Sequence, residues 1–200
     1  PAASTIELLL RRHAAIGDED ALVMARLTLD RMAAGGMYDL LGGGFHRYSV
    51  DVHWLVPHFE KMLYDNALLA SAYLHAWVTT GEERYRQVTE ETLDYVLREL
   101  RLLEGGLASA QDADTDGVEG LTFTWTAEEL EAVLGGAQPD WLLPFEHGRS
   151  ILRGEIPEDA RATLLAVREG RPQPLRDDKA LASWNGLALA ALAEAGARLE

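Results

Sequence analysis

The feature that most constrains the fold is a helical periodicity interrupted by pairs of glycines. Apolar residues recur three and four positions apart through much of the chain, and two of the helical stretches end at Gly35–Gly36 and at Gly105–Gly106. Glycine adopts the left-handed conformation without steric penalty, so it is typical of helix ends. A polar, glycine-bearing connection follows each pair. The pattern predicts an all-α architecture of stacked antiparallel helical hairpins rather than alternating strands and helices.

Four helices are expected in the first half of the chain, from Thr5 to about Ala15, from Asp18 to Gly35, from about Phe59 to Thr79 and from Glu83 to about Glu104. Ser4 and Glu7 form a capping box for the first helix, and Gly35 is expected to end the second as a left-handed stop. Pro57 is expected close to the start of the third, since its fixed φ is tolerated in a first turn. Between the second and third helices, FHRYSV and HWLVP favour irregular extended structure around a turn at Asp51.

The second half is less regular. Residues 107–125 read as a non-helical insertion, after which Thr126 and Glu129 form a capping box for a short helix that ends at Gly135. Residues 140–176 hold four of the seven prolines and one expected helix, over 158–168. A final helix is expected from about Ser183, with an alanine-rich face that permits close helix approach.

Charge and cysteine content exclude several classes of function. Eighteen Lys and Arg against 33 Asp and Glu give a net charge of -15, which repels nucleic-acid backbones and anionic membranes. The chain has no cysteine, so disulfides, thiolate nucleophiles and cysteine zinc sites are excluded within it. No apolar run approaches the roughly 20 residues that span a bilayer, and we expect a cytoplasmic location. The chain begins at Pro1 without Met and ends inside a helical pattern, so we expect it to be part of a larger protein.

The first polar cluster, residues 45–66, is the main candidate for a functional site. A cavity at the start of the third helix would receive four groups suited to proton handling, His58, Lys61, Tyr64 and Asp65. Substrate contacts are expected from His46, Arg47, Asp51 and Trp54. The alternatives are a surface ladder of ion pairs among Glu60, Lys61 and Asp65, and packing of Trp54 in the core. The histidine spacings of seven and five share no helix face, so a zinc site is not our prediction.

The second cluster is a run of aspartates at Asp112, Asp114 and Asp116, followed by Gly117. It fits the start of a calcium loop, but the twelfth position is Phe123 instead of the bidentate Glu. Calcium is therefore one alternative, and capping of turns is another. In the interpretation that we favour, Asp112 and Asp114 line a pocket. A hydrolytic mechanism needs two facing carboxylates, which Asp112 or Asp114 could form with Asp51 or Glu60.

The third cluster lies before the final helix and contains Asp177, Asp178 and Lys179, then Trp184 and Asn185. Asn185 reads either as a helix cap or, with Trp184, as part of a binding rim. Because equivalent ends of successive hairpins face one way, we expect all three clusters to meet at one cavity.

The three clusters together resemble a known family. GGGFHRYSVDVHWLVPHFEKMLYDNALL, SAQDADTDGVEG with TFTWTAEEL, and DDKALASWNGLALAALA occur in an order similar to that of thioredoxin-domain-containing proteins related to spermatogenesis-associated protein 20. The resemblance extends over most of the chain from Met32 onward. It implies a thioredoxin-like domain followed by an (α/α) toroid of six hairpins, similar to N-acylglucosamine 2-epimerases and six-hairpin glycosidases. This chain corresponds to the first part of the toroid and lacks the thioredoxin-like domain. No catalytic residue is carried over from the family.

These observations predict a carbohydrate-active domain without a cofactor or bound metal, with isomerase or epimerase chemistry slightly ahead of hydrolysis. The alternative is a non-catalytic binding or scaffold module that works with a thioredoxin-like domain of the same protein. A calcium-stabilised structural domain is a third reading. Because an incomplete ring exposes apolar helix faces, we also expect self-association.

Overall fold

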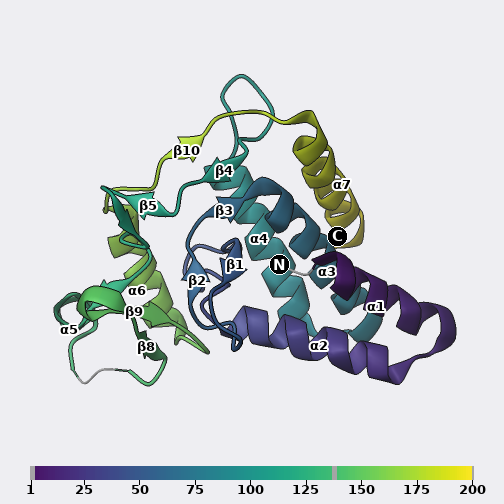
Figure 1. Ribbon diagram of the computed structural model, residues 1–200, viewed down its shortest axis with the longest axis horizontal. Coiled ribbons are helices and arrows are strands. Elements are labelled where there is room, and N and C mark those ends of the chain that lie inside the picture. The colour runs from purple at the N-terminus through teal and green to yellow at the C-terminus, as the bar shows by residue number, and fades with distance from the viewer. Residues whose placement is uncertain (1–2, 137–138, 200) are drawn as a thin grey trace.

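The computed structural model describes residues 3–136 and 139–199. One body of the molecule is formed by five helices, α1, α2, α3, α4 and α7. Helices α5 and α6 lie with short strands to the left of this body in Figure 1. The helices are α1 (Ala3–Ile16), α2 (Glu19–Ala34), α3 (Leu63–Thr80), α4 (Glu83–Glu99), α5 (Ala127–Leu134), α6 (Glu158–Glu169) and α7 (Ala182–Arg198), with a short 3-10 turn η1 (Glu146–Gly148). The strands are β1 (Tyr48–Ser49), β2 (Pro57–His58), β3 (Lys61–Met62), β4 (Ala110–Gln111), β5 (Asp114–Thr115), β6 (Val118–Glu119), β7 (Trp125–Thr126), β8 (Leu142–Pro144), β9 (Arg149–Leu152) and β10 (Arg176–Asp177).

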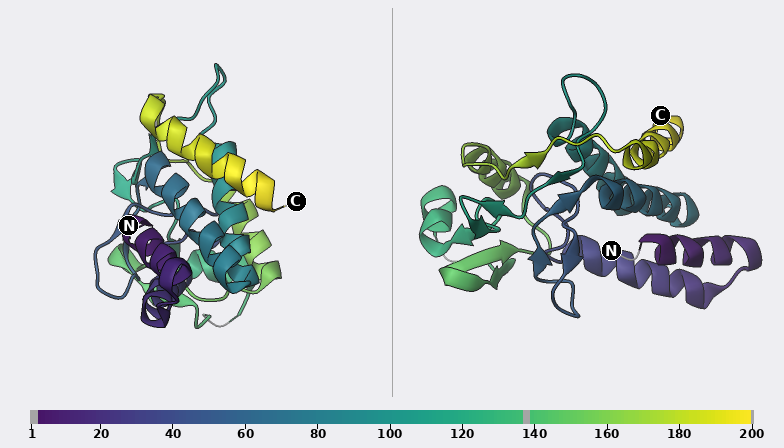
Figure 2. Two further views of the ribbon diagram at one scale, coloured as in Figure 1. Left: turned by 90° about the vertical axis from the view of Figure 1, so that its right-hand side faces the viewer. Right: turned by 45° about the horizontal axis from the view of Figure 1, so that its top comes forward.

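Helix α3 is the centre of the helical body. It packs against α1, α4 and α7, and its alanines and large apolar residues are buried on most sides. The right-hand view of Figure 2 shows α7, α3 and α1 one after another from top to bottom. His75 of α3 links the three helices, since its Nδ1 lies 2.7 Å from Glu7 Oε2 on α1 and its Nε2 lies 3.1 Å from Glu194 Oε2 on α7. Consecutive helices, α1 with α2 and α3 with α4, also pack against each other as helical hairpins.

Local capping signals in the sequence identify several helix ends correctly. Asp18 caps α2 by accepting a hydrogen bond from the Ala21 N–H at 3.1 Å, and Thr126 and Glu129 form the complete capping box of α5. Helices α6 and α7 begin within a residue of the expected positions. The non-helical insertion of residues 107–125 is also confirmed.

Other helix boundaries were predicted wrongly. Ser4 lies within α1 and does not precede it, and α4 ends at Glu99, so the fully exposed Leu103 is outside it. Gly35 ends α2 with an extended backbone at φ -94°, so the left-handed stop is not what requires glycine there. A Cβ at this position would lie 2.0 Å from the carbonyl oxygen of Trp54, so close chain approach is the reason.

The start of the third helix is the boundary that matters most for the site. Pro57 lies in β2, opposite Ser49 of β1, and α3 begins only at Leu63. Between them, β3 pairs with β4, which holds the chain extended through Met62. His58 and Lys61 therefore stand on strands before the helix, while Tyr64 and Asp65 stand in its first turn.

The smaller part of the molecule has its own core around Trp125, which is fully buried. Strand β9 lies between β7 and β8 in a three-stranded sheet, and α5 and α6 pack with this sheet around Trp125. Leu41, from the glycine-rich connection after α2, belongs to the same cluster. That connection thus joins the smaller part to the helical body.

Candidate functional site

A three-stranded sheet with the order β10-β4-β3 joins the three polar clusters of the sequence. Lys61 lies opposite Gln111, which lies opposite Arg176, and Met62, Ala110 and Asp177 form the next row. Side chains alternate between the two faces of a sheet. Met62, Ala110 and Asp177 therefore share one face, and Lys61 and Gln111 share the other.

The outer face of this sheet lines a cavity of about 350 Å³. Its lining includes residues from every cluster, namely Glu60, Met62, Asp112, Asp177, Lys179 and Trp184. If the register continues by one residue, Glu60 is opposite Asp112, and both are on the same face of the sheet as Met62 and Ala110. Cross-strand neighbours have Cβ atoms about 4.5–5.5 Å apart, and both of these side chains line the cavity.

Two cations neutralise part of the acidic lining. Arg47 Nη1 donates to Glu60 Oε2 at 2.6 Å, and Lys179 Nζ donates to Asp177 Oδ2 at 2.8 Å. The hydrogen bond from Lys179 lowers the pKa of Asp177. Asp112 accepts only the N–H of Asp114, at 3.2 Å, among the described residues. Its carboxylate is therefore the most available one in the cavity.

Trp184 and Asn185 have different roles although they are neighbours. Trp184 lines the cavity and its ring lies 4.8 Å from that of Tyr64. Asn185 instead holds the loop before β4, accepting from the Leu107 N–H at 2.7 Å and donating to the Leu107 carbonyl at 2.9 Å. The oxygen and the nitrogen of the Asn185 amide are thus both engaged by the Leu107 backbone, and Asn185 does not line the cavity.

Lys61 lies on the inner face and is almost fully buried. Its Nζ donates to Asp39 Oδ2 at 2.7 Å and to the Gly43 carbonyl at 2.9 Å, while Arg168 Nη1 donates to Asp39 Oδ1 at 2.6 Å. Burial, opposed by the attraction of Asp39, lowers the pKa of Lys61 to about 8. Despite its burial, Asp39 has a pKa well below its usual range because two cations share its carboxylate. The surface ladder of ion pairs considered for Lys61 is therefore wrong.

His46 is buried beside this charged group. Its Nδ1 lies 2.9 Å from the Phe59 carbonyl oxygen, and burial lowers its pKa to about 3, so it is neutral. It lines a small cavity of about 20 Å³ with Asp39 and Arg168, which is a volume for about one water molecule.

His58 lies at the edge of the candidate site. Its Nδ1 is 2.7 Å from Glu119 Oε1 and its Nε2 is 3.8 Å from Glu60 Oε2, and its ring stacks on Tyr48. It is therefore a bridge between the β5–β6 hairpin and Glu60.

Asp65 is buried in the first turn of α3, and burial raises its pKa to about 6. It does not line the cavity. The four expected proton-handling groups thus stand on β2, on the inner face of β3 and in the first turn of α3, and do not form one constellation.

Asp51 and Trp54 stand apart from the cavity. The Asp51 carboxylate accepts the N–H groups of His53 at 2.6 Å, Leu55 at 3.0 Å and Val56 at 2.6 Å, which orders the turn between β1 and β2. This confirms the turn expected at Asp51. Trp54 has a left-handed backbone at φ 64° and packs against the core of the helical body. Core packing was the alternative to substrate contact for this residue.

The aspartate run forms a hairpin. Asp114 lies exposed in β5 opposite Glu119 of β6, and Asp116 takes the turn at φ 53°. Within residues 3–136 and 139–199, no group of three or more His, Asp or Glu side chains is arranged to hold a metal ion. Only Asp112 of the run lines the cavity.

The partners of the buried lysine, Asp39 and Arg168, were not singled out in the sequence. Asp39 lies between the glycine pairs of the connection after α2, and Arg168 is in the last turn of α6. Charged residues flanked by glycines and apolar residues were the available signal for Asp39. Arg168 carries none, since a cation is ordinary in a last helical turn.

Across the described part of the chain, no helix combines the length and apolar character that crossing a bilayer requires. No protein-family model matches the chain.

Comparison with curated proteins relates this sequence to a group of longer proteins. Human spermatogenesis-associated protein 20 is 36% identical over an alignment 228 residues long, which includes 88% of this chain and 29% of the human protein. The mouse protein of the same name matches to the same extent, and an uncharacterized protein of Caenorhabditis elegans is 29% identical over 229 residues. The chain thus spans about a third or less of the length of these relatives. Over the segment that they share, the chain is similar to the proteins named spermatogenesis-associated protein 20.

Proposed function

We propose that the cavity on the β10-β4-β3 sheet binds a carbohydrate or a similar polyhydroxylated molecule, and that the protein cleaves this ligand by hydrolase-type chemistry. The observation that carries the proposal is that Glu60, Asp112 and Trp184 line one cavity, with the two carboxylates next to the paired residues of β3 and β4. The cavity thereby combines two carboxylates with an aromatic surface.

This combination suits a sugar for two reasons. Carboxylates accept hydrogen bonds from hydroxyl groups, and the flat apolar face of an indole packs against the C–H groups of a sugar ring. The cavity volume of about 350 Å³ falls within the range of about 300–1,000 Å³ that small-molecule sites occupy.

The carboxylate pair favours hydrolysis over isomerisation. Glycosidases need two carboxyl groups about 5–5.5 Å apart for retention or about 6.5–9.5 Å apart for inversion, and the Cβ atoms of a cross-strand pair, about 4.5–5.5 Å apart, allow carboxyl separations of this order. An isomerase needs a base at the cavity, whereas Lys61 is paired on the opposite face and His46 is buried as a neutral imidazole. Epimerase chemistry is therefore the second candidate, with His58 next to Glu60 as its available base.

We also propose that the helical body is part of an (α/α) toroid. The packing of α3 between α1 and α7, with α2 and α4 as the second helices of two hairpins, supports this arrangement. A thioredoxin-like domain elsewhere in the full-length protein is the partner that the family resemblance implies.

The experiment is a turnover assay of the full-length protein over a panel of glycosides and free sugars, with release of reducing ends and epimerisation by NMR as readouts. Loss of one catalytic carboxylate lowers rates about 10²- to 10⁴-fold, and we expect losses of this order for Asp112→Asn and Glu60→Gln. Asp114→Asn is the matched control, because Asp114 is exposed on β5, two residues from Asp112, and lies outside the cavity. Equal activity of Asp112→Asn and Asp114→Asn, or neither turnover nor sugar binding by the wild type, would overturn the proposal.

A further inference from the structure

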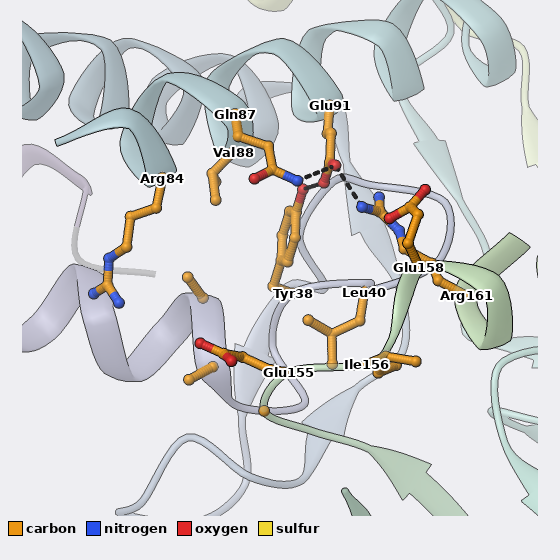
Figure 3. Close-up of a pocket in the computed structure, with 13 residues that line it drawn as sticks. Tyr38, Leu40, Arg84, Gln87, Val88, Glu91, Glu155, Ile156, Glu158 and Arg161 are labelled. Atoms are coloured by element: carbon orange, nitrogen blue, oxygen red, sulfur yellow. Dashed lines mark hydrogen bonds and ion pairs between the residues drawn. The ribbon is translucent and has the colours of Figure 1, made fainter.

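A second cavity, of about 410 Å³, lies between the end of α2, the outer side of α4 and the segment that leads into α6 (Figure 3). It is separate from the carbohydrate site proposed above, since the two share no lining residue. Its walls are mainly apolar, from Ala33, Ala34, Leu40, Val88 and Ile156. A ligand here would bury an apolar body.

One side of this cavity is fixed by a saturated hydrogen-bond group around Glu91. The Tyr38 hydroxyl donates to Glu91 Oε2, Gln87 Nε2 donates to Glu91 Oε1 at 2.9 Å, and Arg161 Nη1 lies 2.7 Å from the same oxygen. Burial and the charge of Glu91 raise the pKa of Tyr38 well above its ordinary value, so its hydroxyl stays a donor. These groups hold the wall in place, and their polar atoms are already engaged.

The remaining charges give the cavity a negative sign. Arg84 is paired with Asp30 and Arg161 with Glu91, so both guanidinium groups of the lining are neutralised. Glu155 and Glu158 also line the cavity and make no ion pair or side-chain hydrogen bond with a described residue. The net charge of -15 on the chain adds to this local field. A cation is therefore the ligand charge that the cavity favours.

The two carboxylates are separated by apolar surface. In Figure 3 the side chains of Glu155 and Glu158 lie on different sides of Leu40 and Ile156. Two cationic groups joined by a methylene chain would pair with one carboxylate each and cover the apolar residues between them.

We propose that this cavity is a binding site for a small aliphatic diamine or polyamine, with ammonium groups at Glu155 and Glu158 and methylene groups over Leu40 and Ile156. The charged ends match the two carboxylates, and the methylene chain matches the apolar floor. The site does not depend on the carbohydrate function.

The test is calorimetric titration of the full-length protein with cadaverine and spermidine, with pentanediol as the uncharged analogue and pentylamine as the monoamine. We expect the diamine and the triamine to bind, the monoamine to bind more weakly and the diol not to bind. Exposed ion pairs contribute about 0.2–1 kcal/mol each, so Glu155→Gln with Glu158→Gln should weaken cadaverine binding about fivefold.

The matched control is Glu104→Gln with Glu169→Gln, which removes the same charge from exposed positions outside the cavity. Both double variants should unfold at the wild-type temperature, because all four side chains are exposed. Equal weakening in the two double variants would show diffuse attraction by the acidic chain and would overturn the proposal. Tighter binding of a lysine-rich peptide than of spermidine would overturn it as well, and would assign the cavity to a protein partner.

Discussion

Replacement of Asp39 tests whether the buried charges between the two parts of the molecule are held by one carboxylate. Asp39→Asn keeps the shape of the side chain but leaves the cations of Lys61 and Arg168 without a counter-charge. Their nitrogen atoms lie 2.7 and 2.6 Å from the Asp39 oxygens, and the Lys61 and Arg168 side chains are 1% and 9% exposed. Breaking a buried pair by removing one partner destabilises a protein by about 3–5 kcal/mol.

A loss of this size is large against the whole stability of a domain, which is about 5–15 kcal/mol. For a chain of this length, each kcal/mol lowers the unfolding temperature by about 2–4 °C, so we expect a decrease of about 6–20 °C. Urea denaturation followed by circular dichroism measures the change. Asp94→Asn is the matched control, since Asp94 is exposed on α4 and makes no ion pair with a described residue. Equal unfolding midpoints for the two variants would refute the reasoning.

The same group also predicts how stability depends on pH. The pKa of Lys61 is about 8 in the folded protein, below its value of 10.5 in the unfolded chain. Above pH 8 the unfolded chain therefore binds more protons at this site, and the free energy of unfolding should rise with pH, by about 2 kcal/mol up to about pH 9.5. Lys61→Met should abolish this rise. A rise of the same size in Lys61→Met would show that other groups cause it.

Two further predictions concern single buried positions. Asp65→Asn should raise the free energy of unfolding at neutral pH by about 1–2 kcal/mol, because the folded-state pKa of about 6 penalises the charged carboxylate, and the gain should vanish below about pH 4; a gain that does not depend on pH would contradict this. Gly44→Ala should lower the urea midpoint more than Gly81→Ala, since both glycines are left-handed but a Cβ at Gly44 would lie 2.5 Å from the Tyr95 ring, whereas Gly81 has open space. Equal midpoints for the two glycine variants would remove the close contact as the reason.

The sequence was informative wherever the deciding interaction is local. Asp18 accepts from an N–H three residues away, and Thr126 and Glu129 cap each other within one turn, so these helix starts could be predicted from neighbouring residues alone. Asp51 orders its own loop in the same way.

The wrong boundary at Pro57 has a non-local cause. Nothing near β3 announces that Lys61 and Met62 will pair with Gln111 and Ala110, and that those will pair with residues preceding α7. A short segment that could enter a helix becomes a strand because two distant strands hold it. The same pairing carries Lys61 to the opposite face from Glu60, so sequence adjacency could not predict their separation.

Because the open cavity and the buried charges lie on opposite faces of the sheet, amino-acid replacements can test them separately. Residues on one face of the sheet, Glu60 and Asp112, line an open cavity, whereas Lys61 on the other face lies in a closed charged group with Asp39. Replacing Asp112 on the open face should change ligand turnover with little effect on unfolding, because this side chain is exposed. Replacing an inner-face charge should change unfolding first. A cavity-face variant that unfolds early while an inner-face variant stays stable would mean that the register of this sheet differs from the one described.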